Sequence, residues 1–337
     1  MLYSFILGCR YGWGNDYLFY KYRFENPYGY ADEDEGYRLL NIFLNDIGCN
    51  YVGAFVAYSL IFIVSAFIWI KDYKENRYML ALFLPATLIF STFPIRQAVA
   101  HSFVFLAFHF LNKKQWLLLL MMILCMYNIH ASSVITISLC GILFLVGEKM
   151  IPWKISIPIY IIVTLASDIF STHIFNFFDS ILPSISLDNK FQNYIDNSDR
   201  WFGEESVNEE WKQGTFTLFL SMAFHISIIY IGYIALKYRP KGKIFYIYNS
   251  MYVGFLLLRM FFTVELLRRI ANPFVMLYFV PLGYALSFLN NNIRRLGKKE
   301  RFLCRASVSF VVIYLVLYWG RFILRSPNYI FFWNKAI

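Results

Sequence analysis

Arg96 stands out among the residues that could do chemistry. It lies in FSTFPIRQAVAH, residues 90–101, between two apolar runs of membrane-spanning character. Pro94 frees backbone groups at this link and puts Arg96 in the first turn of the next helix, where N–H groups point outward. A helix N-terminus combined with a guanidinium is a good site for phosphate or diphosphate. We therefore predict that Arg96 binds an anion, with a structural ion pair as the alternative.

The residues after Arg96 indicate which way this helix faces. Gln97 adds a polar group, and the small side chains of Ala98 and Ala100 permit close helix approach. We therefore expect Arg96 and Gln97 to face neighbouring helices and not lipid. His101 lies deeper along the same run, and we interpret it as a packing group.

Two further segments offer acid–base groups. In CRYGWGNDYLFYKYRF, Arg10 and Asp16 lie among aromatic residues, an arrangement that suits sugar binding. Asp16 is either a helix N-cap or a catalytic carboxylate. His130 lies at the tip of a predicted helical pair over 115–147, where it is either a general acid or base or a helix-end residue bonded to backbone.

Other basic residues lie at the ends of apolar runs. Arg268 and Arg269 directly precede one run, and Arg259 lies four residues before the end of another. Snorkelling to the membrane interface is the simple explanation for an exposed Arg there. The second interpretation is that Arg268 and Arg269 help Arg96 bind an anion. The sequence shows no metal-ligand spacing, so we expect no metal and no cofactor.

Composition identifies the class of protein. The 337 residues are 59% hydrophobic and 21% aromatic, and only 15% are charged, whereas soluble domains carry roughly 25% charged residues. The net charge of +10 is accounted for by basic cytoplasmic loops, so we expect no nucleic-acid partner. The five cysteines form no motif, although a Cys9–Cys49 disulfide remains open.

Repeated apolar runs predict an all-α, polytopic membrane bundle with about ten transmembrane helices. Five short loops, which contain more than half of the Lys and Arg, alternate with the remaining loops and should therefore be cytoplasmic. The predicted spans are 52–70, 78–93, 95–111, 115–128, 130–147, 155–178, 214–236, 244–262, 270–289 and 306–320.

The predicted outer face contains two longer segments, residues 10–51 and 179–213, within one membrane domain over 1–337. EGYRLLNIFLNDIG spaces its apolar residues as an amphipathic helix that lies on the outer surface. The second segment is rich in aromatic and acidic residues and is a candidate lid. Asp168, within the 155–178 span, is a second and weaker site candidate that needs a partner.

Several motifs together resemble the EpsG family of Wzy-like polysaccharide polymerases. They are RYGWGNDYLFY, an acidic residue before an amphipathic helix in DEGYRLLNIFL, FPIRQAVAHSF, NIHASSVI and LRRIANPFVM, spread over roughly residues 10–290. The sequence departs from the family in two respects. The helix expected before RYG is nearly absent, and RRI replaces a single Arg, so Arg268 and Arg269 are equivalent candidates.

The resemblance implies polymerisation of undecaprenyl-diphosphate-linked oligosaccharide repeats for exopolysaccharide, capsule or O-antigen. Glycosyl transfer would take place on the outer face of the bacterial cytoplasmic membrane. The partners implied are the lipid-linked glycan, the bilayer and other polysaccharide export or chain-length proteins. Arg96 and the other arginines would stabilise the leaving diphosphate, and Asp16 or His130 would accept the proton of the acceptor hydroxyl.

Two other classes fit the composition less well. A flippase for lipid-linked oligosaccharides would need charges at midplane depth and internal repeats, and neither is visible. A membrane acyltransferase that modifies glycans would need a His/Asp pair facing the cytoplasm, and the predicted cytoplasmic loops contain no His.

Overall fold

The computed structural model describes most of the chain, which forms two compact units. Unit 1 comprises Met1–Ile142 and Leu315–Ile337, and unit 2 comprises Leu143–Tyr314. Each unit is described by itself below. The described residues are 2–12, 16–29, 34–92, 95–130, 133–146, 149–167, 213–238, 244–262, 264–325 and 330–331.

Unit 1 is a group of helices with one two-residue β-pair. β1 (Arg10–Tyr11) pairs antiparallel with β2 (Ile330–Phe331). The helices are α1 (Leu2–Gly8), α2 (Tyr17–Glu25), α3 (Glu35–Asp46), α4 (Tyr51–Ile70), α5 (Asn76–Thr92), α6 (Ile95–Lys113), α7 (Trp116–Ile129) and the larger part of α8 (Ser133–Val146).

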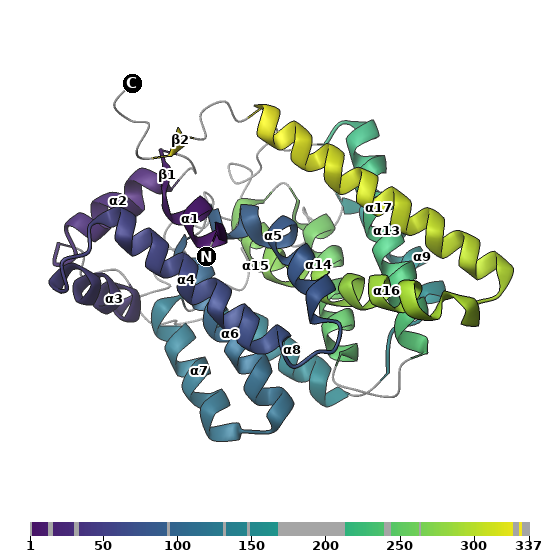
Figure 1. The fold of residues 1–337 in the computed structure, drawn as a ribbon, viewed down its shortest axis with the longest axis horizontal. Helices are drawn as coiled ribbons and strands as arrows, with labels where there is room; N and C mark the ends of the chain where they lie inside the picture. The colour runs from purple at the N-terminus through teal and green to yellow at the C-terminus, as the bar shows by residue number, and fades with distance from the viewer. Residues whose placement is uncertain are drawn as a thin grey trace. The chain divides into compact units, whose positions relative to one another are not determined.

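Helix α6 lies at the centre of unit 1, packed against α4 and α7 (Figure 1). Ala98 and Ala100 are buried, at 5% and 0% exposure. Because these side chains are small, the neighbouring helices approach closely, as the sequence predicts. Further along the helix, Phe105 stacks on Trp69 of α4 with ring centroids 5.5 Å apart. A central α6 means that residues at its N-terminus are held from several sides.

Unit 2 is also helical. The Asn249 side chain binds the segment before α9: it donates to the Lys149 carbonyl and accepts from the Ile151 N–H. Gly254 lets α14 meet α15 closely, because a Cβ there would lie 2.5 Å from Cβ of Phe274. The helices are α9 (Trp153–Leu165), α13 (Thr215–Lys237), α14 (Phe245–Met260), α15 (Glu265–Met276), α16 (Phe279–Asn292), the 3₁₀ turn η4 (Ile293–Arg295) and most of α17 (Lys298–Arg325).

Four helical stretches of the described chain are long and apolar enough to cross a membrane: Tyr51–Ile70, Thr215–Lys237, Leu267–Arg295 and Lys298–Gly320. Trp116–Ile129, Ser133–Leu145 and Trp153–Leu165 are shorter apolar helices. The all-helical character predicted from sequence is therefore confirmed for the part of the chain that the structure describes, in which the short β-pair is the one exception. The total of about ten spans and the single domain over 1–337 stay predictions.

Two predicted boundaries were wrong. The span predicted over 270–289 lies within the single helical stretch Leu267–Arg295, but its helix begins earlier, at Glu265 of α15, so Arg268 and Arg269 lie inside a helix and not before one. Helix α17 begins at Lys298, eight residues before the predicted 306, because charged residues at a helix end reach the interface. Asp168 and the proposed lid, except Gln213, lie outside the described residues.

Candidate active site

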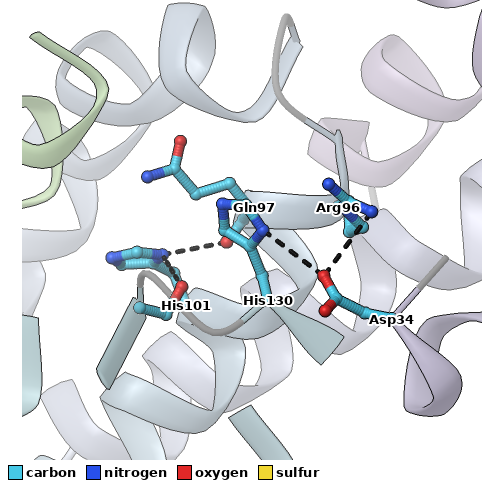
Figure 2. A network of polar contacts seen from close by, with 6 residues as sticks. Asp34, Arg96, Gln97, His101 and His130 are labelled. Atoms are coloured by element: carbon cyan, nitrogen blue, oxygen red, sulfur yellow. Dashed lines mark hydrogen bonds and ion pairs between the residues drawn. The ribbon is translucent and has the colours of Figure 1, made fainter. Parts of the chain in front are cut away.

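Asp34 is the centre of a charged cluster in unit 1 (Figure 2). Its Oδ2 lies 3.5 Å from Nη1 of Arg96 and 3.7 Å from Nδ1 of His130. The side chains are 14% exposed for Asp34, 24% for Arg96 and 21% for His130, so each is shielded yet reachable. Both distances exceed that of a short hydrogen bond. The Arg96–Asp34 contact is an ion pair, and the His130–Asp34 contact becomes one when the imidazole is protonated.

A close contact between α3 and α7 brings Asp34 to His130. Asp34 occupies the N-cap position of α3 and makes no side-chain capping bond, which leaves its carboxylate for other contacts. Two residues later, a Cβ on Gly36 would lie 2.9 Å from the carbonyl oxygen of Asn128. Glycine at 36 therefore allows the start of α3 to lie against the end of α7, two residues before His130.

Arg96 is the second residue of α6, in the first turn that the sequence predicts. Ile95 and Gln97 on either side of it are 4% exposed. The buried start of α6 fixes the position of the Arg96 backbone, and the guanidinium reaches the partly exposed cluster around Asp34. The structural ion pair, which was the alternative interpretation of Arg96, is present. The position of Arg96 in the first turn of α6, near the N–H groups of that turn, is also consistent with anion binding.

His130 ends α7 and joins it to α8. Its N–H donates to the Met126 carbonyl at 2.8 Å, and its carbonyl accepts from the Ser133 N–H at 2.9 Å. The backbone of His130 is thus fixed by both helices, while the imidazole turns to Asp34 (Figure 2). The predicted helical pair with His130 at its tip is confirmed.

A second layer of polar side chains lies around His101. His101 is 0% exposed, and its Nδ1 donates to the Gln97 carbonyl at 2.9 Å. Hydroxyl groups of Ser133 and Thr136 lie 3.5 Å from its two ring nitrogens. His101 is a packing group, as predicted. The Gln97 amide extends away from the Asp34 carboxylate (Figure 2), and a role for Gln97 in binding diphosphate or glycan stays a prediction.

Arg10 lies against the same end of α6. It is 1% exposed, donates to the Leu7 carbonyl and lies 5.7 Å from the centre of the Phe55 ring. It lines a small cavity together with apolar residues of α4 and α6, including Ile95 and Val99. The sequence prediction of an Arg beside aromatic rings is confirmed, but a buried Arg10 is a poorer contact for a large glycan than an exposed one.

Asp16 is half-buried at the N-cap position of α2, and it makes no side-chain capping bond. The cap interpretation of Asp16 therefore holds only for its backbone, whose carbonyl accepts from the Tyr20 N–H. The catalytic interpretation stays a prediction. The carboxylate that contacts both Arg96 and His130 is that of Asp34.

Arg268 and Arg269 belong to unit 2, where both are half-buried in the first turns of α15. The arginines lie in the N-terminal half of an amphipathic helix, a location consistent with anion binding and equally with local pairing.

Asp34 is the functional candidate that sequence reasoning missed. It was visible only as the acidic residue that precedes an amphipathic helix in DEGYRLLNIFL. Its partners come from two distant segments, and side-chain contact between such segments depends on tertiary packing. Among the described residues, no three His, Cys, Asp or Glu side chains gather as a metal site.

The cluster combines groups of complementary chemistry. Arg96 supplies positive charge and fork-shaped donors for an anion, His130 can take up a proton near neutral pH, and Asp34 can stabilise the imidazolium that results. The chain is therefore a helical membrane protein with a partly shielded cluster of a carboxylate, a guanidinium and an imidazole. The chain matches the EpsG family model over residues 1–334 and belongs to that family.

EpsG proteins are Wzy-like membrane proteins associated with polysaccharide biosynthesis. No curated protein and no solved structure matches the chain.

Proposed function

We propose that this protein is a polysaccharide polymerase that joins undecaprenyl-diphosphate-linked oligosaccharide repeats on the outer face of the cytoplasmic membrane. The observation that carries this proposal is the Asp34–Arg96–His130 cluster in a member of the EpsG family. The products are chains of repeat units for exopolysaccharide, capsule or O-antigen.

The reaction exchanges one C–O bond for another. The bond between the anomeric carbon of the donor glycan and its diphosphate oxygen breaks, and that carbon forms a glycosidic bond with an acceptor hydroxyl. The bonding electrons leave with the lipid diphosphate, and the hydroxyl proton goes to a base. No oxidant or nucleotide is consumed.

Arg96 suits the leaving group. Its guanidinium lies in the first turn of α6, where the backbone N–H groups add partial positive charge. Charge that builds on the diphosphate as the bond breaks is stabilised there more than in the ground state, which is what lowers the barrier. Arg10, Arg268 and Arg269 are further candidates for contacts with diphosphate or glycan.

His130 suits the base. Nδ1 of His130 is directed to Asp34, so Nε2 is the ring nitrogen that we propose takes the proton of the acceptor hydroxyl. The Asp34 carboxylate would stabilise the charged ring. Asp16 is the alternative base, and Asp16→Asn should abolish polymerisation if that assignment holds.

Complementation of a polymerase-null strain tests the proposal. Arg96→Ala and Arg96→Lys should both lose long chains and accumulate lipid-linked single repeats, because Lys lacks the bidentate fork. Arg77→Ala is a matched control, since Arg77 is also the second residue of its helix, α5, yet is exposed. It should leave chain length unchanged.

Two outcomes count against the proposal. Normal chain length with Arg96→Ala, at a normal protein level, contradicts the role of Arg96. Single repeats that stay on the cytoplasmic leaflet of the null strain would instead identify a flippase.

A further inference from the structure

Helix α3 has two apolar faces, and only one of them is buried in unit 1. Tyr37 and Leu44 on the buried face are 1% and 6% exposed. On the other face, Leu39, Phe43 and the C-cap residue Ile47 are 54%, 60% and 59% exposed. These three residues follow one another at every fourth position, so they form a single line along the helix, here called the α3 stripe.

Helix α4 shows at what depth the α3 stripe lies relative to a membrane. It is long and apolar enough to cross a membrane, and its 20 residues extend about 30 Å, the thickness of the hydrocarbon core. When α4 crosses the bilayer, Tyr51 and Ile70 at its two ends therefore lie at the two boundaries of that core. An element that packs beside the first turns of α4 then lies within the core and not above it.

Helix α3 packs beside those first turns. The Tyr58 hydroxyl donates to Oδ1 of Asn41, which is 0% exposed, and the ring centroids of Tyr37 and Tyr58 are 5.7 Å apart. Tyr58 is the eighth residue of α4, so its Cα is about 10 Å along the helix from Tyr51. Helical side chains lean toward the helix N-terminus, and Tyr37 shares a buried cluster with Phe55. The contacts with α3 therefore fall beside the first two turns of the span.

The connection between α3 and α4 holds this arrangement. Gly48, with φ of +82°, ends α3, and its N–H donates to the Asn45 carbonyl at 2.8 Å. Asn50 begins α4, because its Oδ1 accepts from the Gly53 N–H at 2.9 Å. Both helix ends are closed, so the short link over 47–50 has little freedom and keeps α3 beside the start of α4.

We propose that α3 lies in the upper acyl-chain region of one leaflet, with the α3 stripe against lipid acyl chains. The sequence alone predicts a helix on the membrane surface, and the packing against α4 lowers it into the leaflet. At that depth, exposed Leu, Phe and Ile side chains are in a favourable solvent, whereas water around them is unfavourable. Glu35 and Asp46 are exposed along one edge of the helix, and this edge faces the headgroups.

This placement has a consequence for the charged cluster of unit 1. Asp34 is the N-cap residue of α3 and contacts Arg96 and His130, so the cluster lies at the level of α3. For the proposed function, on which this consequence alone rests, a lipid-linked substrate would then reach the cluster from within the leaflet.

Thiol reactivity measures whether water reaches the α3 stripe, in the full-length chain purified into phosphatidylcholine nanodiscs. Phe43→Cys and Leu39→Cys place a thiol at exposed positions. Both should react with a membrane-impermeant maleimide at least about tenfold more slowly than Lys74→Cys, because a thiolate does not persist among acyl chains. Lys74 is an exposed residue between α4 and α5. The wild-type chain, whose five cysteines are buried or half-buried, gives the background.

Fluorescence quenching identifies what covers the α3 stripe. Bimane, a small membrane-permeable fluorophore, attached to Phe43→Cys should be quenched more strongly by lipids with brominated acyl chains than by lipids with a spin-labelled headgroup. Bimane on Lys74→Cys should show the opposite order.

Three results overturn the proposal. Reaction of Phe43→Cys as fast as that of Lys74→Cys would place the α3 stripe in water. Slow reaction without quenching by brominated chains would mean that protein, such as a second copy of the chain, covers it. Stronger quenching from the headgroup would place α3 above the acyl chains. If Phe43→Cys fails to fold, Leu39→Cys decides, and no readout needs glycan transfer, so the result is independent of whether the protein is a polymerase.

Discussion

The Asp34 carboxylate contacts two basic side chains that have different tasks. Arg96 is permanently charged, whereas the charge of His130 depends on its proton. A single oxygen, Oδ2, lies near both, so a change at one base alters the field at the other. If an anion displaces Arg96 from Asp34, the carboxylate loses its contact with the guanidinium and keeps its contact with His130.

Residues that act in series give non-additive losses, and this predicts the outcome of a double-mutant cycle. His130→Gln should lower the polymerisation rate by roughly 10²–10⁴-fold, the usual contribution of a general base. Asp34→Asn should give a smaller loss, because the imidazole remains. The double variant should be no slower than His130→Gln alone. In vitro elongation of a lipid-linked repeat measures all three rates.

Multiplied losses in the double variant would mean that Asp34 acts independently of His130. Asp16→Asn belongs in the same assay as the competing base. If Asp16→Asn lowers the polymerisation rate as much as His130→Gln does, the general base is Asp16, at the start of α2.

Single residues were predictable where local sequence determines them. Arg96 in the first turn of its helix follows from the proline before it, and the burial of His101 follows from its depth along an apolar run. Asp34 was not predictable as a site residue, because nothing in its own segment specifies contact with α6 and α7. Arg259 was visible as a basic residue near a helix end, but its hydrogen bonds to Tyr160, Gln213 and Ser221 depend on tertiary packing.

At the level of elements, glycine determines how closely helices meet around the cluster. Gly36 in α3 faces the backbone of Asn128, and Gly141 in α8 has no atom within 4 Å of a Cβ placed on it. Both lie in helices, where alanine is normally better than glycine by about 1 kcal/mol. Alanine substitutions at Gly36 and Gly141 therefore distinguish the effect of helix propensity, which both share, from the effect of close packing, which only Gly36 has.

Gly36→Ala should lower Tm and chain length together, because the new methyl group must move α3 away from α7 and Asp34 away from His130. A loss of roughly 1–3 kcal/mol is the usual cost of an overpacked contact. Gly141→Ala should be neutral or slightly stabilising. Thermal unfolding in detergent and glycan length in complemented cells measure the two effects. Equal Tm values for both variants would show that α3 adjusts without cost.

Most elements could be predicted from apolar periodicity, and the failures have physical causes. Helix α3 was expected as an amphipathic surface helix, and Phe43 and Ile47 are indeed 60% and 59% exposed. The span predicted over 270–289 is contained in the helical stretch Leu267–Arg295, but its start was placed too late. The charged residues Arg268 and Arg269 end the apolar run in the sequence, although the helix continues through them to Glu265.

At the scale of the whole molecule, the helices differ in how much of their surface the protein itself covers. Only 11% of the Lys298–Gly320 window is buried, against 50–72% for the other three candidate spans. Exposed apolar side chains such as Ile313, at 57%, are unfavourable in water and suitable in lipid. We infer that this stretch of α17 faces acyl chains over most of its circumference.

The membrane assignment can be tested by placing a charge where the structure alone would tolerate it. Ile313→Lys lies near the middle of the 298–320 stretch, and in lipid a central Lys costs about 2.5–3.5 kcal/mol. In water, the same exposed substitution would cost within about 0.5 kcal/mol.

Phe302→Lys is the control, since Phe302 is 71% exposed but lies beside Lys298, Lys299 and Arg301, where a long side chain reaches the interface. Ile313→Lys should lower the amount of folded protein in the membrane fraction severalfold, with Phe302→Lys near the wild-type level. Equal amounts of the two variants would mean that this side of α17 does not lie in the bilayer, because the penalty comes from lipid and from nothing within the protein.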